Sequence, residues 1–282
     1  MKKSILIFAF ALASSLTFAQ DATVAATPEA EAAEPKFTAA VDVVYPYLWR
    51  GVRYYGDDLA IQPYANYSIT DKLSFGVWAT TNVTSKADSY FEFDWSIAYQ
   101  ISPILSVTLA DYYWPATKKN EDWERSSYFD YSDGSAKTLD LSLLFDFSEK
   151  GVPIDFTWST FIGGGDYKGD EDNRTRAYSS YAEVGYTHSF DKPGIDVRPF
   201  VGAAVLNEGG YYGTDANGNA GFTFTNVGLN IAKEFKISEN YSLPVFVRYT
   251  NNDYGVQKFD NDDNLTKTIR NFFSCGVTFT IK

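Results

Sequence analysis

The sequence predicts an all-β protein that forms one transmembrane antiparallel β-barrel of about twelve strands. Three observations predict this fold: strand-like alternation of apolar and polar residues, connections that alternate in length, and many aromatic residues at low hydropathy. Phe, Trp and Tyr make up 17% of the chain, yet mean hydropathy is only -0.25. Strands with one lipid-facing and one lumen-facing side account for both properties together.

The clearest alternation lies in residues 89–101, SYFEFDWSIAYQI. Every second residue from Phe91 to Ile101 is bulky and apolar, whereas the residues between them include Glu92 and Asp94. Successive side chains of a strand point to opposite faces, so this segment is predicted as a long strand with one apolar and one polar face. Such an apolar face suits the core of a β-sandwich as well as the lipid-facing wall of a β-barrel.

The connections favour the barrel over the sandwich. Twelve alternating segments are predicted as strands: residues 37–49, 60–69, 73–82, 89–101, 105–113, 138–147, 154–162, 177–190, 197–206, 222–235, 241–250 and 268–281. Short turns follow the even strands, and mostly long polar loops, the last of them residues 251–267, follow the odd ones. Bacterial outer-membrane barrels have this asymmetry, with short periplasmic turns and long external loops. Pro46 interrupts the first strand and predicts a bend or bulge, because proline lacks the ladder donor.

The N-terminus predicts export. Lys2 and Lys3 precede a short apolar run, and small residues end at Ala19, so residues 1–19 are predicted as a signal peptide. Residues 20–36 are rich in Ala, Glu, Pro and Thr and are expected to form a disordered acidic linker. The transmembrane barrel is then expected to occupy residues 37–282.

Composition excludes some classes of function. Loss of Lys2 and Lys3 leaves 22 basic against 36 acidic residues, which argues against a nucleic-acid partner. The single cysteine, Cys275, excludes an internal disulfide, so an exported chain needs another source of stability, and a closed barrel supplies it.

A resemblance rests on the N-terminal third of the predicted barrel. Residues 41–52, VDVVYPYLWRGV, precede Ile61-Gln62-Pro63, Gly76-Val77-Trp78 and the acidic-aromatic strand that contains Phe91 to Trp95. This order resembles the TorF-like (Gcw-chp) family of outer-membrane porin-like proteins, most closely over residues 37–113. The resemblance implies a porin-like barrel in the outer membrane and says little about its solute.

No residue pattern predicts catalysis or a resident metal. His188 is the only histidine, and Ser189 is adjacent, so the two side chains point to opposite faces of a strand and cannot form a catalytic pair. Residues 166–172 and 251–264 are rich in Asp and Asn and offer oxygen ligands for Ca²⁺, but solvated loop tips are the simpler interpretation. We therefore expect no catalytic residue, no metal and no cofactor.

The predicted site consists of charged residues at the strand positions that face the lumen. Charge on the lipid face costs several kcal/mol, so these side chains are expected to line a pore. They are Asp42, Glu92, Asp94, Asp140, Asp155, Glu183, Arg198, Arg248 and Arg270. Acids outnumber arginines in this set, which favours a polar channel over a fully paired, closed interior.

These features predict an outer-membrane channel for passive diffusion of small polar solutes, with a mild cation preference. The expected partners are outer-membrane lipid, the small solutes and the barrel-assembly machinery that inserts such proteins. Two alternatives remain open: a closed structural or surface-binding barrel that acts through its external loops, and a membrane-embedded lipid-modifying enzyme.

Overall fold

The computed structural model describes residues 36–53, 56–83, 90–115, 127–259 and 265–281. The predicted signal peptide and almost all of the acidic linker lie outside these residues and stay predictions. Among the described residues, no helix is long and apolar enough to cross a membrane.

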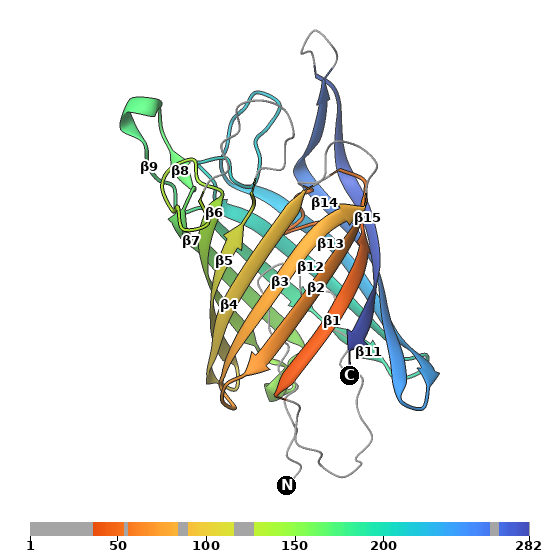
Figure 1. Cartoon of the computed structure of the whole chain (residues 1–282). Coiled ribbons are helices and arrows are strands. Elements are labelled where there is room, and N and C mark those ends of the chain that lie inside the picture. The colour runs from red at the N-terminus through yellow and green to blue at the C-terminus, as the bar shows by residue number, and fades with distance from the viewer. Residues whose placement is uncertain (1–35, 54–55, 84–89, 116–126, 260–264, 282) are drawn as a thin grey trace.

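The chain forms a closed antiparallel barrel (Figure 1). Its wall is built from β1 (Phe37–Tyr45), β2 (Leu59–Ser68), β3 (Leu73–Val83), β4 (Phe91–Ser102), β5 (Leu105–Tyr113), β6 (Lys137–Asp146), β7 (Ile154–Gly164), β10 (Ser180–Tyr186), β11 (His188–Phe190), β12 (Ile195–Leu206), β13 (Thr223–Ser238), β14 (Tyr241–Phe259) and β15 (Leu265–Ile281). β10 and β11 lie end to end against β12, so the wall has twelve strands. β1 pairs with β15 and closes the ring.

The remaining elements lie outside the wall. A small hairpin, β8 (Tyr167–Lys168) and β9 (Thr175–Arg176), projects from the connection between β7 and β10. Two short 3-10 helices, η2 (Ser148–Lys150) and η3 (Glu171–Asn173), lie in connections between strands. The short turns gather at the end of the barrel where β1 begins and β15 ends, and the long connections gather at the other end (Figure 1).

The predicted fold and the alternation of faces are confirmed. On β4 the inward residues Glu92, Asp94, Ser96 and Ala98 are buried, whereas Phe91 and the other outward residues are partly or fully exposed. The same pattern runs along β3, where residues 74, 76, 78, 80 and 82 are buried. A polar inner face and an apolar outer face place this wall in lipid, since only a closed barrel satisfies every strand hydrogen bond there.

Several strand boundaries were predicted wrongly, most clearly in three places. The first strand ends at Tyr45, and residues 46–53 leave the wall. The segment 251–267, predicted as a loop, is largely strand: β14 and β15 continue as a paired hairpin beyond the barrel rim (Figure 1). This hairpin contacts the connection between β12 and β13, where Gln257 Nε2 donates to the Thr214 carbonyl at 3.0 Å, and its sequence lacks the apolar alternation that marks the wall. The predicted strand 177–190 begins only at Ser180 and is interrupted at Thr187.

The direction of each side chain on β4 predicts how charge is tolerated. Ile97 is outward and 41% exposed near the middle of the strand, whereas Gln100 is inward and half-buried. Ile97→Lys is expected to destabilise the folded barrel by about 2–4 kcal/mol, and Gln100→Lys by much less. Urea unfolding in lipid vesicles, followed by the heat-modifiable gel shift, measures both; equal destabilisation would contradict the assigned faces.

Candidate functional site: the barrel interior

The segment after β1 turns into the barrel. The Tyr45–Pro46 peptide bond is cis, and the chain then forms a tight turn at residues 49–52. The Trp49 N–H donates to the Val52 carbonyl at 2.9 Å, and the Val52 N–H donates to the Trp49 carbonyl at 2.8 Å. Arg50 and Gly51 both have positive φ, 48° and 76°, as in a type I′ turn. We call residues 46–53 the inward turn.

Contacts from the wall hold the inward turn in place. Asn252 Nδ2 on β14 donates to the Gly51 carbonyl at 2.9 Å, and Ser274 Oγ on β15 donates to the Pro46 carbonyl at 2.8 Å. A Cβ on Gly51 would overlap the carbonyl oxygen of Thr225 on β13. Glycine is therefore required here twice, by its φ and by this close approach.

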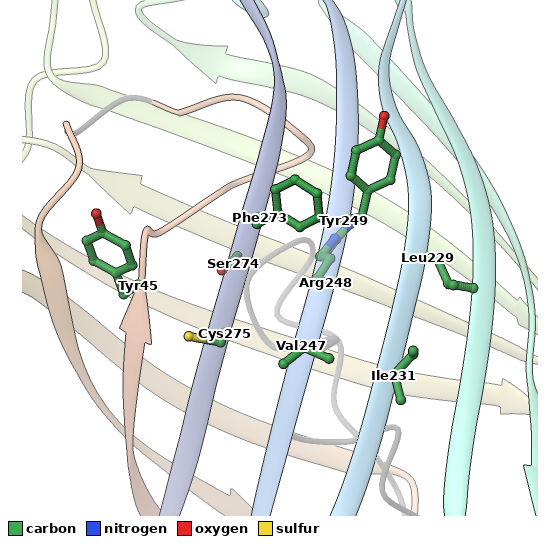
Figure 2. A pocket seen from close by; sticks show the side chains of 9 residues that line it. All are labelled: Tyr45, Leu229, Ile231, Val247, Arg248, Tyr249, Phe273, Ser274 and Cys275. Carbon is green, nitrogen blue, oxygen red and sulfur yellow. The ribbon is translucent and has the colours of Figure 1, made fainter.

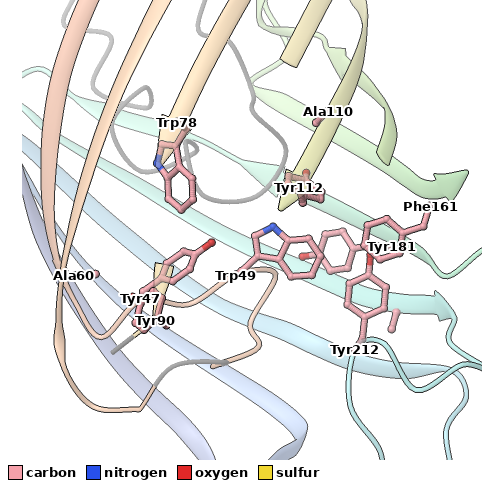
Figure 3. Packing of buried hydrophobic residues seen from close by; sticks show 11 residues of the cluster. Tyr47, Trp49, Ala60, Trp78, Tyr90, Ala110, Tyr112, Phe161, Tyr181 and Tyr212 are labelled. Atoms are coloured by element: carbon pink, nitrogen blue, oxygen red, sulfur yellow. The ribbon is translucent and has the colours of Figure 1, made fainter. Parts of the chain in front are cut away.

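Aromatic side chains fill the interior around the turn (Figure 3). We call this set the interior aromatic cluster: Tyr47, Trp49, Trp78, Tyr90, Tyr112, Phe161, Tyr181 and Tyr212, packed with Ala60, Ala110 and Ala204. The Trp49 ring stacks on Tyr212 at 5.6 Å and on Phe161 at 6.1 Å between centroids. Tyr212 comes from the connection between β12 and β13, so two connections enter the lumen and pack against each other.

Arg50 lies at the centre of this cluster. Its guanidinium pairs with the Asp140 carboxylate on β6 and donates to the Tyr212 hydroxyl at 2.5 Å. The rings of Trp49 and Tyr181 lie 4.5 and 5.2 Å from its central carbon, within cation–π range. Both charged side chains are buried, so each depends on the other for compensation.

A second polar cluster lies on β7, β10 and β12–β14. Arg198 donates to Asp155 at 2.6 Å and to Glu183 at 3.1 Å. Asn226 Nδ2 donates to Glu183 at 2.6 Å, and Arg248 donates to Asn226 Oδ1 at 2.9 Å. These four charged residues, all predicted to line a pore, are thus joined into one network on the inner wall.

Three predicted acids stand apart from both clusters. Asp42 on β1 and Glu92 and Asp94 on β4 are each at most 4% exposed. No ion pair between described residues involves them. We call these three residues the acidic wall. Arg270, by contrast, is exposed on the hairpin above the rim, where it donates to the Asp253 carbonyl; although it has inward parity, it lies beyond the lumen.

One ion pair that the sequence did not predict lies on the outer face. Asp111 and Lys137 have the parity of lipid-facing residues, yet both are fully buried and paired. The connection before β6 folds over them: the Lys137 ammonium lies 3.7 Å from the Tyr128 ring centroid, and the Tyr131 hydroxyl donates to Asp111. The sequence does carry a signal for this feature: a charged residue at a lipid-facing position near the rim. Such a residue indicates that a loop covers it.

The other polar candidates have structural surroundings. His188 is exposed and contacts the Phe190 ring at the periplasmic end. Asp166 accepts hydrogen bonds from the Ser179 N–H at 2.8 Å and hydroxyl at 2.7 Å. Burial raises the pKa of Asp166, and these hydrogen bonds act in the opposite direction. Within the described ranges, no group of three or more His, Cys, Asp or Glu has the spacing of a metal site.

The outer wall carries a shallow groove of about 440 Å³ across β13–β15 (Figure 2). Leu229, Ile231, Val247, Phe273 and Cys275 line it, and their side chains are largely apolar and exposed. Its position on the apolar face makes it part of the lipid-facing surface, separate from the interior.

The inward turn carries Trp49-Arg50-Gly51, which belongs to the first of the segments on which the family resemblance rests. Residues 29–227 match the model of a family described as bacterial protein of unknown function (Gcw_chp). The chain belongs to this family. No curated protein matches the sequence. A solved structure, the COG4313 outer membrane channel from Pseudomonas putida F1, is 12% identical over 90% of this chain and 98% of that one, with a TM-score of 0.42.

The Gly51 environment predicts a strong effect of a small substitution. Gly51→Ala adds both a strained φ and a clash with the β13 backbone, so it is expected to displace the inward turn. Gly134→Ala is the matched control, because Gly134 has a similar φ of 73° but open space around it. The control should cost about 1–2 kcal/mol and Gly51→Ala clearly more, measured by urea unfolding. Equal costs would show that the turn is loosely packed.

The Arg50–Asp140 pair predicts a large loss of stability on neutralisation. Asp140→Asn leaves a buried guanidinium without its counter-charge, which is expected to cost about 3–5 kcal/mol. Asp133→Asn removes a pair with Arg174 whose side chains are 32% and 40% exposed, and should cost less than about 1 kcal/mol. If both variants unfold at the same urea concentration, the buried pair does not hold the interior together.

Proposed function

We propose that this protein is an outer-membrane channel for small polar solutes, narrowed by the inward turn, with a mild preference for cations. The observation that carries this proposal is the acidic wall. A barrel that served only as a closed scaffold would be expected to pair its buried charges, because an uncompensated buried charge is costly.

The distribution of interior charge supports the cation preference. Asp140 is compensated by Arg50, and Arg198 compensates Asp155 and Glu183 in part. Asp42, Glu92 and Asp94 add carboxyl groups that form no ion pair with a basic residue among those described. In a watery lumen, such groups lower the energy of a passing cation and raise that of an anion.

A closed, surface-binding barrel is the second candidate. The observation that favours it is the interior aromatic cluster, whose packing around Arg50 fills the lumen at the level of the inward turn. Under this alternative the external connections engage a partner, and the folded protein conducts no ions.

Planar-bilayer recordings in a salt gradient distinguish the two candidates. The refolded mature chain is expected to give stable conductance steps with a cation-selective reversal potential. Glu92→Gln/Asp94→Asn should move that potential towards zero, because it removes two carboxylates from the passage. Asp71→Asn, in an exposed turn between β2 and β3, is the control and should leave it unchanged.

A folded barrel that stays silent would overturn the channel and favour the closed barrel. If the barrel conducts but Glu92→Gln/Asp94→Asn leaves its ion selectivity unchanged, the acidic wall does not line the passage.

A further inference from the structure

The surroundings of Arg50 show how the interior of this protein binds a guanidinium group. Around Arg50 it places one carboxylate, one phenol and several aromatic faces. This combination compensates the charge by an ion pair and surrounds it with ring faces. The cation here belongs to the chain itself.

The part of the interior around β3 and β4 repeats this chemistry. Glu92 is in register with Thr80, and Asp94 with Trp78. Tyr47 packs on Trp78 with ring centroids 5.8 Å apart (Figure 3), and Glu92 hydrogen-bonds the Trp114 side chain. Carboxyl groups and aromatic faces therefore adjoin here as they do around Arg50.

Two buried polar atoms at this place lack a protein partner among the described residues. Glu92 Oε2, on a side chain 2% exposed, has no hydrogen-bond donor, and Trp78 Nε1, also on a 2% exposed side chain, has no acceptor. Buried polar groups are otherwise almost always satisfied. The unsatisfied Glu92 acceptor is free to take a hydrogen bond from a ligand in the lumen, whereas the Trp78 N–H would need an acceptor group.

A further acceptor lies along the same inner wall. Asp42 Oδ1 is buried and has no hydrogen-bond partner within the described part of the chain. Asp42 is in register with Gln62, Gln62 donates to Thr80 at 3.4 Å, and Thr80 is in register with Glu92. Three inter-strand steps of about 4.8 Å separate Asp42 from Glu92, which forms a polar track across β1–β4.

We propose that Glu92, with Asp94 and the faces of Tyr47 and Trp78, forms a binding site for a small organic cation that carries a guanidinium or primary ammonium group. The inference rests on the proposed channel function in one respect: it names the class of solute that the lumen selects. Glu92 Oε2 accepts a hydrogen bond from the cation, and the aromatic faces cover its apolar side. Asp42 offers the next carboxylate along the wall.

Direct binding tests this site without relying on conductance. Isothermal titration calorimetry on the detergent-refolded barrel compares methylguanidinium with N-methylurea, a neutral molecule of nearly the same shape. Methylguanidinium is expected to bind and N-methylurea is not. Glu92→Gln should weaken methylguanidinium binding roughly tenfold to hundredfold, since it removes a charge-assisted hydrogen bond. Asp71→Asn is the control and should bind as the wild type does.

The heat-modifiable gel shift first establishes that each variant folds. If Glu92→Gln does not fold, Asp94→Asn tests the same site from the adjacent carboxyl group. Absence of methylguanidinium binding to the wild type, or equal affinity in the folded Glu92→Gln or Asp94→Asn variant, would overturn the site. Binding by a barrel that is silent in bilayers would retain the site and reject the channel.

Discussion

The buried pair between Arg50 and Asp140 is the interaction on which the interior depends. A guanidinium in the middle of a barrel is tolerated only with a nearby counter-charge and satisfied donors. Asp140 and Tyr212 meet that requirement, and they come from β6 and from the connection between β12 and β13. One side chain at the tip of the inward turn thereby fixes the position of three separate parts of the chain.

The membrane imposes the complementary constraint on the wall. Every strand must turn its apolar residues to lipid, which leaves only the inward positions for polar chemistry. Polar and charged residues consequently accumulate in the lumen, where Arg198, for example, pairs with Asp155 and Glu183. The lumen-facing side is thus the part of the wall where this chain concentrates its polar interactions.

The wall was predictable because alternation reports directly which face meets lipid. The inward turn was not, although Pro46 marks where it begins. Tyr47 and Trp49 continue the parity of the outward residues Val43 and Tyr45, and aromatic side chains suit a lipid face as well as an interior. Nothing local distinguishes the two environments until Asp140 and Tyr212, 90 and 162 residues away, are placed beside Arg50.

Contacts between distant parts of the chain also account for the other differences between the predicted and observed structure. Asp111 follows Leu109 with outward parity, and only the fold of the connection before β6 reveals the cover over its charge. The register between strands that are distant in sequence likewise decides which interior charges form pairs. The sequence therefore predicts which charged residues face inward, but not which residue each of them pairs with. Glu92 and Arg198 have the same parity, yet Arg198 forms ion pairs with Asp155 and Glu183, whereas Glu92 forms no ion pair with a described residue.

If the inward turn narrows a conducting lumen, its removal must widen the passage. The most direct test is single-channel conductance of a chain in which residues 47–52 are replaced by a Gly-Ser linker of equal length, with Asp140→Asn to remove the orphaned charge. The gel shift controls for folding. Conductance well above that of the wild type is the predicted result. A folded replacement that conducts no more than the wild type, or not at all, would contradict a channel narrowed by this turn.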